Sequence, residues 1–437
     1  MTAIFVALIV LGVIIVIHEF GHFAVAKFFK IKVETFSVGF GPRLIGFRRG
    51  ETDYRISALP LGGYVKMSGE NPGDNITGDP REFLSKPKWQ RFLVAAAGPI
   101  MNIVLAFALL TGLLMYGTEI PEFLNNQAVV GIVMPDSPAA QAGIRVNDRI
   151  VAMDGKQDPN WQDIGLIIGT NPSRQLSLTV ERAGQRIDTT LTPKADERQG
   201  TGEAGMGPFI RTVVKSVGPG SPAAAAGIQP NDEIIAVNGV DLRTSGKSIQ
   251  ETIQTIPQDT FPITVLRNGA PVDVNVTPIV DQGKRMIGIG IPPPTILVKL
   301  GFVDAVSRSA QMNADNAKLI FQVLGRLLKR EASVKQLDGP IGIVRASGQA
   351  ADIGLAALIM LTAAISLNLG LVNLLPIPIL DGGVMLLLMI EFVMGRDLSL
   401  RIKERIVQVS MVFLLLMMVV VLYNDVLKLM PPSTGTP

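Results

Sequence analysis

The sequence predicts a membrane protein with four transmembrane helices and a duplicated α+β module outside the bilayer. Three observations lead to this fold class. With 48% hydrophobic residues, 18% charged residues and a mean hydropathy of +0.37, the chain is more apolar than an ordinary soluble protein. Four windows of about 20 apolar residues are each long enough to cross a bilayer. The segment between the second and third windows repeats itself.

Composition also excludes several classes of protein. The chain has no cysteine, which rules out disulfides, iron–sulfur clusters, cysteine-liganded zinc and a thiol nucleophile. The net charge is only +3, and no Lys/Arg-rich run with interleaved aromatic residues occurs. Nucleic acid is therefore not an expected partner.

The four apolar windows are roughly Ile4–Ala26, Phe92–Tyr116, Ile353–Ile379 and Val407–Leu427. Because Pro376 and Pro378 cannot continue a regular helix, we expect an irregular end to the third span, sheltered by protein or lining a wet cavity. The chain then divides into spans 1–26, 92–116, 353–379 and 407–427, a segment 27–91, two repeats 127–210 and 211–292, and connecting regions 293–352 and 380–406.

Basic residues set the expected orientation. No basic residue precedes the first window, as a signal peptide would require, whereas Lys27, Lys30 and Lys32 follow it. Residues 27–91 hold twelve Lys/Arg against seven Asp/Glu, which places them in the cytoplasm. Both termini and residues 117–352 are then expected outside.

The external segment is a duplication. Ser137–Ile144 recurs as Ser221–Ile228, and Asn147–Gly155 recurs as Asn231–Gly239. Only two long units are present, which suits two small domains better than a solenoid of many short repeats.

The motif SPAxxAGI, followed by Asn-Asp and a turn, resembles PDZ domains. Glycine-containing strands at Met206–Phe209 and Ile287–Gly290 end the two units, which resembles the circularly permuted bacterial PDZ arrangement. Such domains bind a peptide strand or a C-terminal carboxylate. A steric filter above the membrane is an equally open interpretation, and the two roles can coexist.

The first span carries His18, Glu19 and His22, and these are the only two histidines of the chain. Four residues apart on a helix, the imidazoles share one face and can bind one Zn²⁺, with the glutamate as general base. The alternative is a chance match with hydrogen-bonded histidines in a helix bundle. An acidic residue in a span costs about 2.5–3.5 kcal/mol, which favours the zinc site. At about 1.5 Å per residue, His18 lies roughly 21 Å into a core about 30 Å thick, nearer the cytoplasmic side.

A catalytic zinc takes a third protein ligand, which here must be Asp or Glu. Two Leu-Asp-Gly triplets supply the candidates Asp338 and Asp381. Asp338 precedes the third span and is external, whereas Asp381 follows it at the cytoplasmic end, where the histidines lie. We therefore choose Asp381 and expect the Gly382-Gly383 turn to direct its carboxylate back towards them.

Two asparagines in the spans are candidate substrate-binding groups. Asn373 could hold substrate backbone or a developing oxyanion near the metal, and its alternative is helix–helix hydrogen bonding, as for Asn368. For Asn102 the choice between substrate binding and packing stays even.

Together, HEFGH at 18–22, GPIMN at 98–102, the tandem PDZ pattern and NLLPIPILDG at 373–382 resemble the site-2 protease family of intramembrane zinc metalloproteases. The resemblance covers essentially the whole chain. It implies zinc ligation by His18, His22 and Asp381, with Glu19 as catalytic base and Asn373 as a substrate-contacting amide.

Within residues 36–67 the sequence resembles the family's membrane-associated β-hairpin loop. The alternating Tyr54, Ile56 and Ala58 fit an exposed strand edge that could pair with an unwound substrate. The resemblance implies single-span membrane substrates, namely a pre-trimmed anti-sigma factor or leftover signal peptides. It also implies a bacterial inner-membrane location with periplasmic PDZ domains and termini.

Two rival functions remain. A non-enzymatic scaffold would use the PDZ pair to recruit envelope proteins, and a transporter would use the intramembrane acids as an ion pathway. Both rivals predict that Glu19→Gln leaves function intact. The amphipathic region 303–330 is expected to be an external helix packed on the repeats or the membrane surface.

Overall fold

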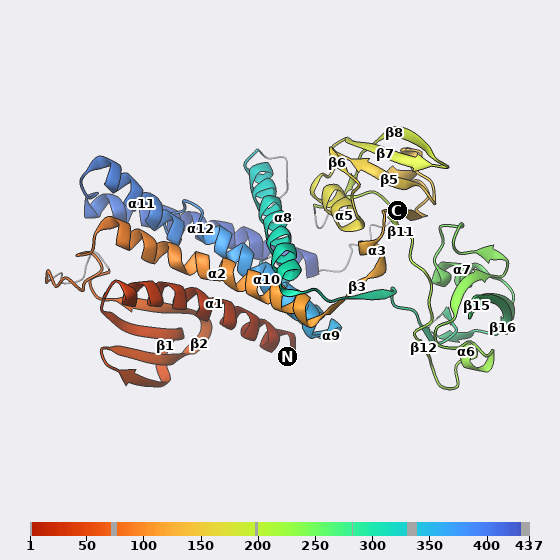
Figure 1. Ribbon diagram of the computed structural model, residues 1–437, viewed down its shortest axis with the longest axis horizontal. Coiled ribbons are helices and arrows are strands. Elements are labelled where there is room, and N and C mark those ends of the chain that lie inside the picture. The colour runs from red at the N-terminus through yellow and green to blue at the C-terminus, as the bar shows by residue number, and fades with distance from the viewer. Residues whose placement is uncertain (1, 71–76, 197–199, 282, 330–338, 430–437) are drawn as a thin grey trace. The chain divides into compact units, whose positions relative to one another are not determined.

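The computed structural model describes residues 2–70, 77–196, 200–281, 283–329 and 339–429. The chain divides into two compact units (Figure 1). One joins Met1–Thr118 to Lys299–Pro437 and is mainly helical, and the other is the sheet-rich segment Glu119–Val298. Each is described by itself below.

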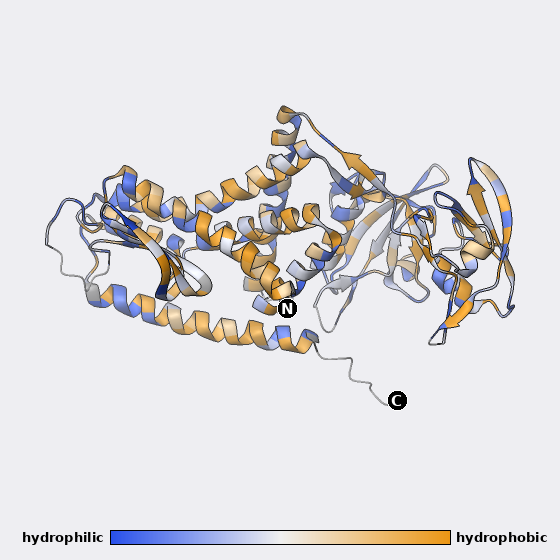
Figure 2. Ribbon diagram, turned by 90° about the horizontal axis from the view of Figure 1, so that it is seen from below, coloured by the Kyte–Doolittle hydropathy of each residue, from blue (hydrophilic) through white to orange (hydrophobic). Residues whose placement is uncertain are grey.

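The helical unit contains seven helices among the described residues: α1 (Thr2–Phe28), α2 (Lys88–Tyr116), α8 (Phe302–Leu328), α9 (Pro340–Ile353), α10 (Leu355–Asn373), α11 (Asp381–Met394) and α12 (Leu400–Leu429). Within the described residues, four segments are long and apolar enough to cross a membrane: Ala3–Phe28, Lys88–Tyr116, Leu355–Asn373 and Arg401–Lys428. They match the four predicted windows and are mainly hydrophobic along their length (Figure 2).

The third span differs in extent from its prediction. α10 begins at Leu355, after Gly354 has broken the chain away from α9, and it ends at Asn373. Residues 374–380 are not helical, as Pro376 and Pro378 predicted. Helix α11 then begins at Asp381 and was not predicted. Its 14 residues are too short to span a bilayer core.

Glycines allow the spans to touch. A Cβ atom on Gly21 of α1 would lie 2.4 Å from the Ala97 carbonyl oxygen of α2, and one on Gly370 of α10 would lie 2.9 Å from the Pro99 oxygen. Bare backbone at these positions lets α1 and α10 pack closely against α2, the usual device of helix pairs in membranes. Helix α2 is therefore the element against which α1 and α10 are positioned.

The amphipathic region 303–330, expected to pack on the repeats or the membrane surface, forms the single helix α8, which packs on the second span instead. The hydroxyl of Ser309 donates to the Phe107 carbonyl of α2 at 3.0 Å, and Ser309 is fully buried. The helix therefore packs on α2.

Strands β1 (Val33–Arg49) and β2 (Thr52–Met67) form a hairpin. Both strands bend, so that different segments of β1 pair with different segments of β2. Residues 43–49 pair with 52–57, and residues 33–38 pair both with 53–56 and with 63–67. The segments therefore lie side by side in the sheet in the order 43–49, 52–57, 33–38, 63–67. Within the described residues, segments 43–49 and 63–67 are the two edges of this sheet.

The sheet-rich unit holds two similarly built halves. In the first, the strand order is β6-β5-β7-β8, with β11 paired to β4 and β10 to β9; in the second it is β14-β13-β15-β16, with β12 paired to β19 and β17 to β18. The first half comprises β4 (Val130–Val133), α4 (Pro138–Gln141), β5 (Arg149–Met153), β6 (Lys156–Gln157), α5 (Trp161–Thr170), β7 (Leu176–Arg182), β8 (Gln185–Leu191), β9 (Lys194–Ala195), β10 (Gly202–Glu203) and β11 (Met206–Pro208).

The second half comprises β12 (Ser216–Val217), α6 (Pro222–Ala225), β13 (Glu233–Val237), β14 (Val240–Asp241), α7 (Ile249–Thr255), β15 (Phe261–Arg267), β16 (Ala270–Val276), β17 (Ile279–Asp281), β18 (Lys284–Met286) and β19 (Ile289–Gly290). Two further strands, β3 (Thr118–Pro121) and β20 (Thr295–Val298), pair with each other, and α3 (Glu122–Asn125) follows β3.

The repeated sequence motifs make the same contacts in both halves. The Ser137 and Ser221 hydroxyls each accept a hydrogen bond from the backbone N–H three residues on, at 3.2 Å, and so cap the short helices α4 and α6. Asp148 and Asp232 are buried, and each is held at 2.7 Å by an arginine of the long hairpin, Arg182 or Arg267.

Candidate metal centre

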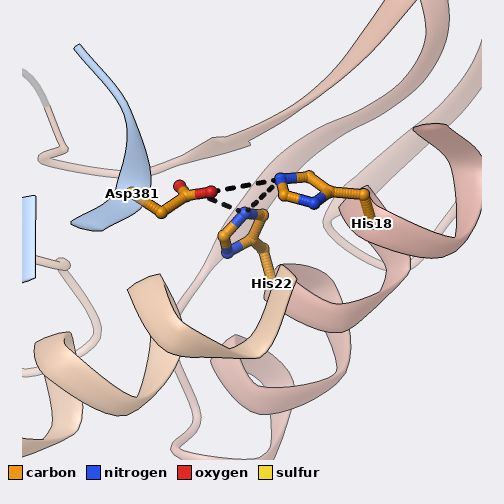
Figure 3. A group of neighbouring side chains, drawn as sticks. All are labelled: His18, His22 and Asp381. Atoms are coloured by element: carbon orange, nitrogen blue, oxygen red, sulfur yellow. Dashed lines mark hydrogen bonds and ion pairs between the residues drawn. The ribbon is translucent and has the colours of Figure 1, made fainter. Parts of the chain in front are cut away.

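Three side chains that the sequence singled out converge in the helical unit. His18 and His22 lie one turn apart on α1, and Asp381 comes from the first turn of α11 (Figure 3). Asp381 lies 3.2 Å from the Nε2 of His18 through its Oδ2 atom and 3.4 Å from the Nε2 of His22 through its Oδ1 atom. The two Nε2 atoms are 3.2 Å apart. One donor atom from each residue lies within 4.8 Å of the others, a spacing that can hold a metal ion.

The loop before α11 explains how Asp381 reaches the histidines. A Cβ atom on Gly382 would lie 2.3 Å from the carbonyl oxygens of Leu374 and Leu375, and one on Gly383 would lie 2.2 Å from that of Ile377. The loop 374–380 therefore folds over the first turn of α11, which only glycines allow. The glycines were expected to form a turn. Instead they begin the helix, and their role is to permit this close approach.

The central helix α2 makes room for the two imidazoles. A Cβ atom on Gly98 would lie 2.3 Å from the Nε2 of His22 and 2.8 Å from the Nε2 of His18. One turn earlier, the Val94 carbonyl accepts a hydrogen bond from the Nδ1 of His22 at 2.7 Å. A carbonyl can only accept, so this bond places the proton of a neutral His22 on Nδ1 and leaves Nε2 as a ligand atom facing the cluster.

Glu19 lies beside the cluster and faces the hairpin. It interacts electrostatically with His22 and Asp381, and its carboxylate accepts a hydrogen bond from the backbone N–H of Val65. A Cβ atom on Gly63 would lie 3.2 Å from the Cγ atom of Glu19. The edge segment 63–67 therefore runs next to the glutamate.

The strand expected to form the exposed edge is in the interior of the hairpin sheet, so the edge assignment was wrong. Tyr54 pairs with Phe47 on one side and with Phe36 on the other, and Ile56 likewise pairs on both sides. The ring of Tyr54 also packs against the ring of Phe23 of α1, with 5.8 Å between the ring centroids. Ala58 follows half-buried at the end of this segment. The segment beside Glu19 that pairs on one side only is 63–67.

The two asparagines occupy different positions. Asn102 is fully buried, and its Nδ2 atom lies 3.2 Å from the Nδ1 of His18. Asn373 is the last residue of α10 and is partly exposed; within the part of the chain that the structure describes, no protein group hydrogen-bonds its amide. Asp338, the rival third ligand, lies outside the described residues.

Sequence reasoning missed three groups around the cluster: the Val94 carbonyl, the space at Gly98 and the Val65 N–H. The motif Gly98–Asn102 gave a partial signal, since its two end residues are one helical turn apart and both contact a histidine. The two backbone groups carry no sequence signal.

Comparisons with known proteins identify the family of the chain. The model of peptidase family M50 matches residues 6–417. The chain is 33% identical to the "Regulator of sigma E protease" of Haemophilus influenzae and 32% identical to the "Regulator of sigma-E protease RseP" of Escherichia coli, in both cases over 97% of this chain and 98% of the relative. It is 30% identical to the "Putative zinc metalloprotease NMA0084" of Neisseria meningitidis, over 96% of this chain and 97% of the relative. The chain belongs to peptidase family M50.

Proposed function

We propose that this chain is an intramembrane zinc metalloprotease that hydrolyses peptide bonds within the transmembrane segments of single-span proteins. The convergence of His18, His22 and Asp381 beside Glu19 carries the proposal. Membership of a peptidase family and the zinc metalloprotease name of one relative support it. Two neutral imidazoles and a carboxylate are a donor set that a catalytic zinc takes, with one position left for a reacting group.

Each residue then has a defined task. His18, His22 and Asp381 would hold the zinc, which would supply Lewis-acid polarisation to the reacting groups. Glu19 accepts the proton of the attacking water and passes it to the leaving amine. The Asn373 amide, which has no protein partner among the described residues, holds a substrate carbonyl.

The substrate must lose its helix before it can be cut, because a transmembrane helix hides its carbonyls in i→i−4 hydrogen bonds. An extended substrate can pair along the one-sided edge 63–67, which runs beside Glu19, if it replaces Glu19 and Glu70 as acceptors of the Val65 and Met67 N–H groups. On the opposite edge, Leu44, Ile45 and Phe47 are each more than 60% exposed, which supports membrane contact of the hairpin.

The chain is proposed to lie in a bacterial inner membrane, with residues 27–91 in the cytoplasm and both termini outside. The Lys/Arg excess of 27–91 and the four apolar spans support this orientation. Its substrates are expected to be a trimmed anti-sigma factor or leftover signal peptides, in keeping with the relatives named regulators of sigma E.

The two external repeats, 127–210 and 211–292, are proposed to be circularly permuted PDZ domains. In the first, a groove of about 450 Å³ lies between α5 and the β10–β11 segment and is lined by Trp161, Ile164, Ile168 and Met206. Strand β11 pairs with β4 alone among the described residues, so its other edge can add a peptide strand. This observation favours peptide binding in the first repeat, and filtering by size remains compatible with it.

Titration of the full chain with an apolar C-terminal peptide tests the groove, because Trp161 lines it. We expect a saturable change in tryptophan emission that Ile164→Asp abolishes. Equal emission changes in both proteins would leave the repeats as a filter only. Filtering itself requires that a trimmed substrate be cut faster than one with its external domain intact.

The central test compares wild type with Glu19→Gln, each purified whole in detergent. Both should hold about one zinc per chain, while Glu19→Gln should cut a single-span test peptide about 10²–10⁴-fold more slowly. The matched control Glu34→Gln changes a glutamate that pairs with Lys66 on the hairpin, and it should keep the wild-type rate. Wild-type cleavage by Glu19→Gln would refute Glu19 as the base, whereas a wild type that neither holds zinc nor cuts the peptide would favour the scaffold.

A further inference from the structure

The two histidines of the cluster are held by different kinds of partner. His22 donates from Nδ1 to a backbone carbonyl, which any sequence would supply at that position. His18 instead depends on a side chain, because its Nδ1 faces the carboxamide of Asn102 at 3.2 Å. The orientation and tautomer of His18 are therefore set by the identity of residue 102.

The backbone of Asn102 is itself held in place by α10. The residue is fully buried, and its backbone carbonyl accepts a hydrogen bond from the Ser366 hydroxyl of α10 at 2.8 Å. A Cβ atom added to Gly370 would lie 3.3 Å from the Cβ atom of Asn102, so α10 is in contact with it. Its Oδ1 atom is buried and has no hydrogen-bond partner among the described residues. An unpaired buried amide oxygen is costly unless a donor is available to it.

The proton on His18 decides what the cluster can bind. If Nδ2 of Asn102 donates to Nδ1 of His18, the proton of the neutral ring sits on Nε2, and Nε2 cannot ligate a metal. A half-turn of the carboxamide exchanges its two ends, which are nearly equal in size. Oδ1 then accepts from Nδ1–H, and the Nε2 lone pair faces His22 and Asp381.

We propose that Asn102 is a positioning residue, whose Oδ1 accepts the Nδ1–H of His18 and so fixes that imidazole as a ligand through Nε2. This inference rests on the proposed zinc centre and adds to it the partner of the first histidine. It assigns to Asn102 neither substrate binding nor simple packing. Partners of this kind around metal-bound histidines are worth about 10–100-fold in metal affinity.

Zinc affinity measured by chelator competition, together with the visible spectrum of the Co²⁺-substituted protein, tests this role without relying on activity. Asn102→Leu keeps the volume and removes the acceptor, so zinc should bind about 10–100-fold more weakly and the Co²⁺ spectrum should change. Asn102→Asp keeps the acceptor oxygens and removes the donor, so it should restore affinity relative to Asn102→Leu. The matched control Asn368→Leu alters an exposed asparagine of α10 and should behave as wild type.

The outcomes separate the inference from the function on which it rests. Wild-type affinity and spectrum in Asn102→Leu would overturn the inference while leaving the zinc centre intact. Equal loss in Asn102→Leu and Asn102→Asp, with helix content unchanged, would also overturn it, because the amide would then act as donor or packing group. A wild type that binds no zinc would instead refute the proposed function, and the inference with it.

Discussion

A single methyl group on Gly98 should disable the metal centre. In Gly98→Ala the new Cβ atom would lie 2.3 Å from the Nε2 of His22 and 2.8 Å from the Nε2 of His18, against an ordinary contact of at least 3.4 Å. Those nitrogens are the two imidazole atoms proposed as ligands, and zinc lies about 2.0–2.1 Å from such an atom. The methyl group therefore competes with the metal for the same space.

The geometry sets the size of the effect. Either α1 moves away from α2 by about 1 Å, or the imidazoles leave their rotamers, and such overpacking costs about 1–3 kcal/mol. A displacement of about 1 Å at a reacting centre costs about 10²-fold in rate. We expect Gly98→Ala to lose zinc on dialysis and to cut a single-span test peptide at least about 100-fold more slowly than wild type.

Gly112→Ala is the matched control, because it lies on the same helix and a Cβ atom there meets nothing within 4 Å. Zinc content and cleavage rate are measured on both variants alongside wild type. Wild-type zinc content and rate in Gly98→Ala would show that the imidazoles do not meet α2 as described, and the geometry of the centre would have to be abandoned.

Two further predictions concern other parts of the chain. Asn373→Leu should lower kcat for the test peptide by about 10²–10³-fold while zinc content stays at the wild-type level; steady-state kinetics with metal analysis measures both, and unchanged kinetics would remove Asn373 from the site. Asp232→Asn removes the buried charge that pairs with Arg267, so it should destabilise the second repeat and make it the first region cut in limited proteolysis of the whole chain. The hydrogen bonds from Arg267 hold the pKa of Asp232 below its usual value. The stability that this pair provides is therefore present above about pH 3.9, the pKa of an unfolded Asp, and is lost as pH falls through the lower pKa of the folded state. Equal protease resistance of wild type at pH 7 and pH 3 would contradict this.

The spans and the two histidines of the cluster could be predicted from the sequence because both depend on local patterns. Apolar windows of sufficient length identify the spans. The spacing of His18 and His22 places them on one helix face whatever the rest of the fold does. Asp381 needed one step of elimination and the predicted topology, and the structure places its carboxylate with the histidines.

The errors arose where long-range pairing decides the structure. The alternation at Tyr54 and Ile56 correctly indicated a strand, but alternation does not report whether a strand has neighbours on one side or both. Here β1 folds back along both sides of that segment. The contact of Asn102 with His18 was equally hidden, because only the crossing of α1 and α2 brings the two residues together.

The identity of the third ligand tests the account most directly. Zinc stoichiometry is measured on purified wild type, Asp381→Asn and Asp338→Asn, the last being the rival Leu-Asp-Gly aspartate. The account predicts that Asp338→Asn keeps the wild-type zinc content. Asp381→Asn should bind zinc more weakly than wild type by a larger factor than the about 10–100-fold that loss of a residue supporting a ligand causes. Full zinc in Asp381→Asn, or loss in Asp338→Asn alone, would contradict the proposed centre.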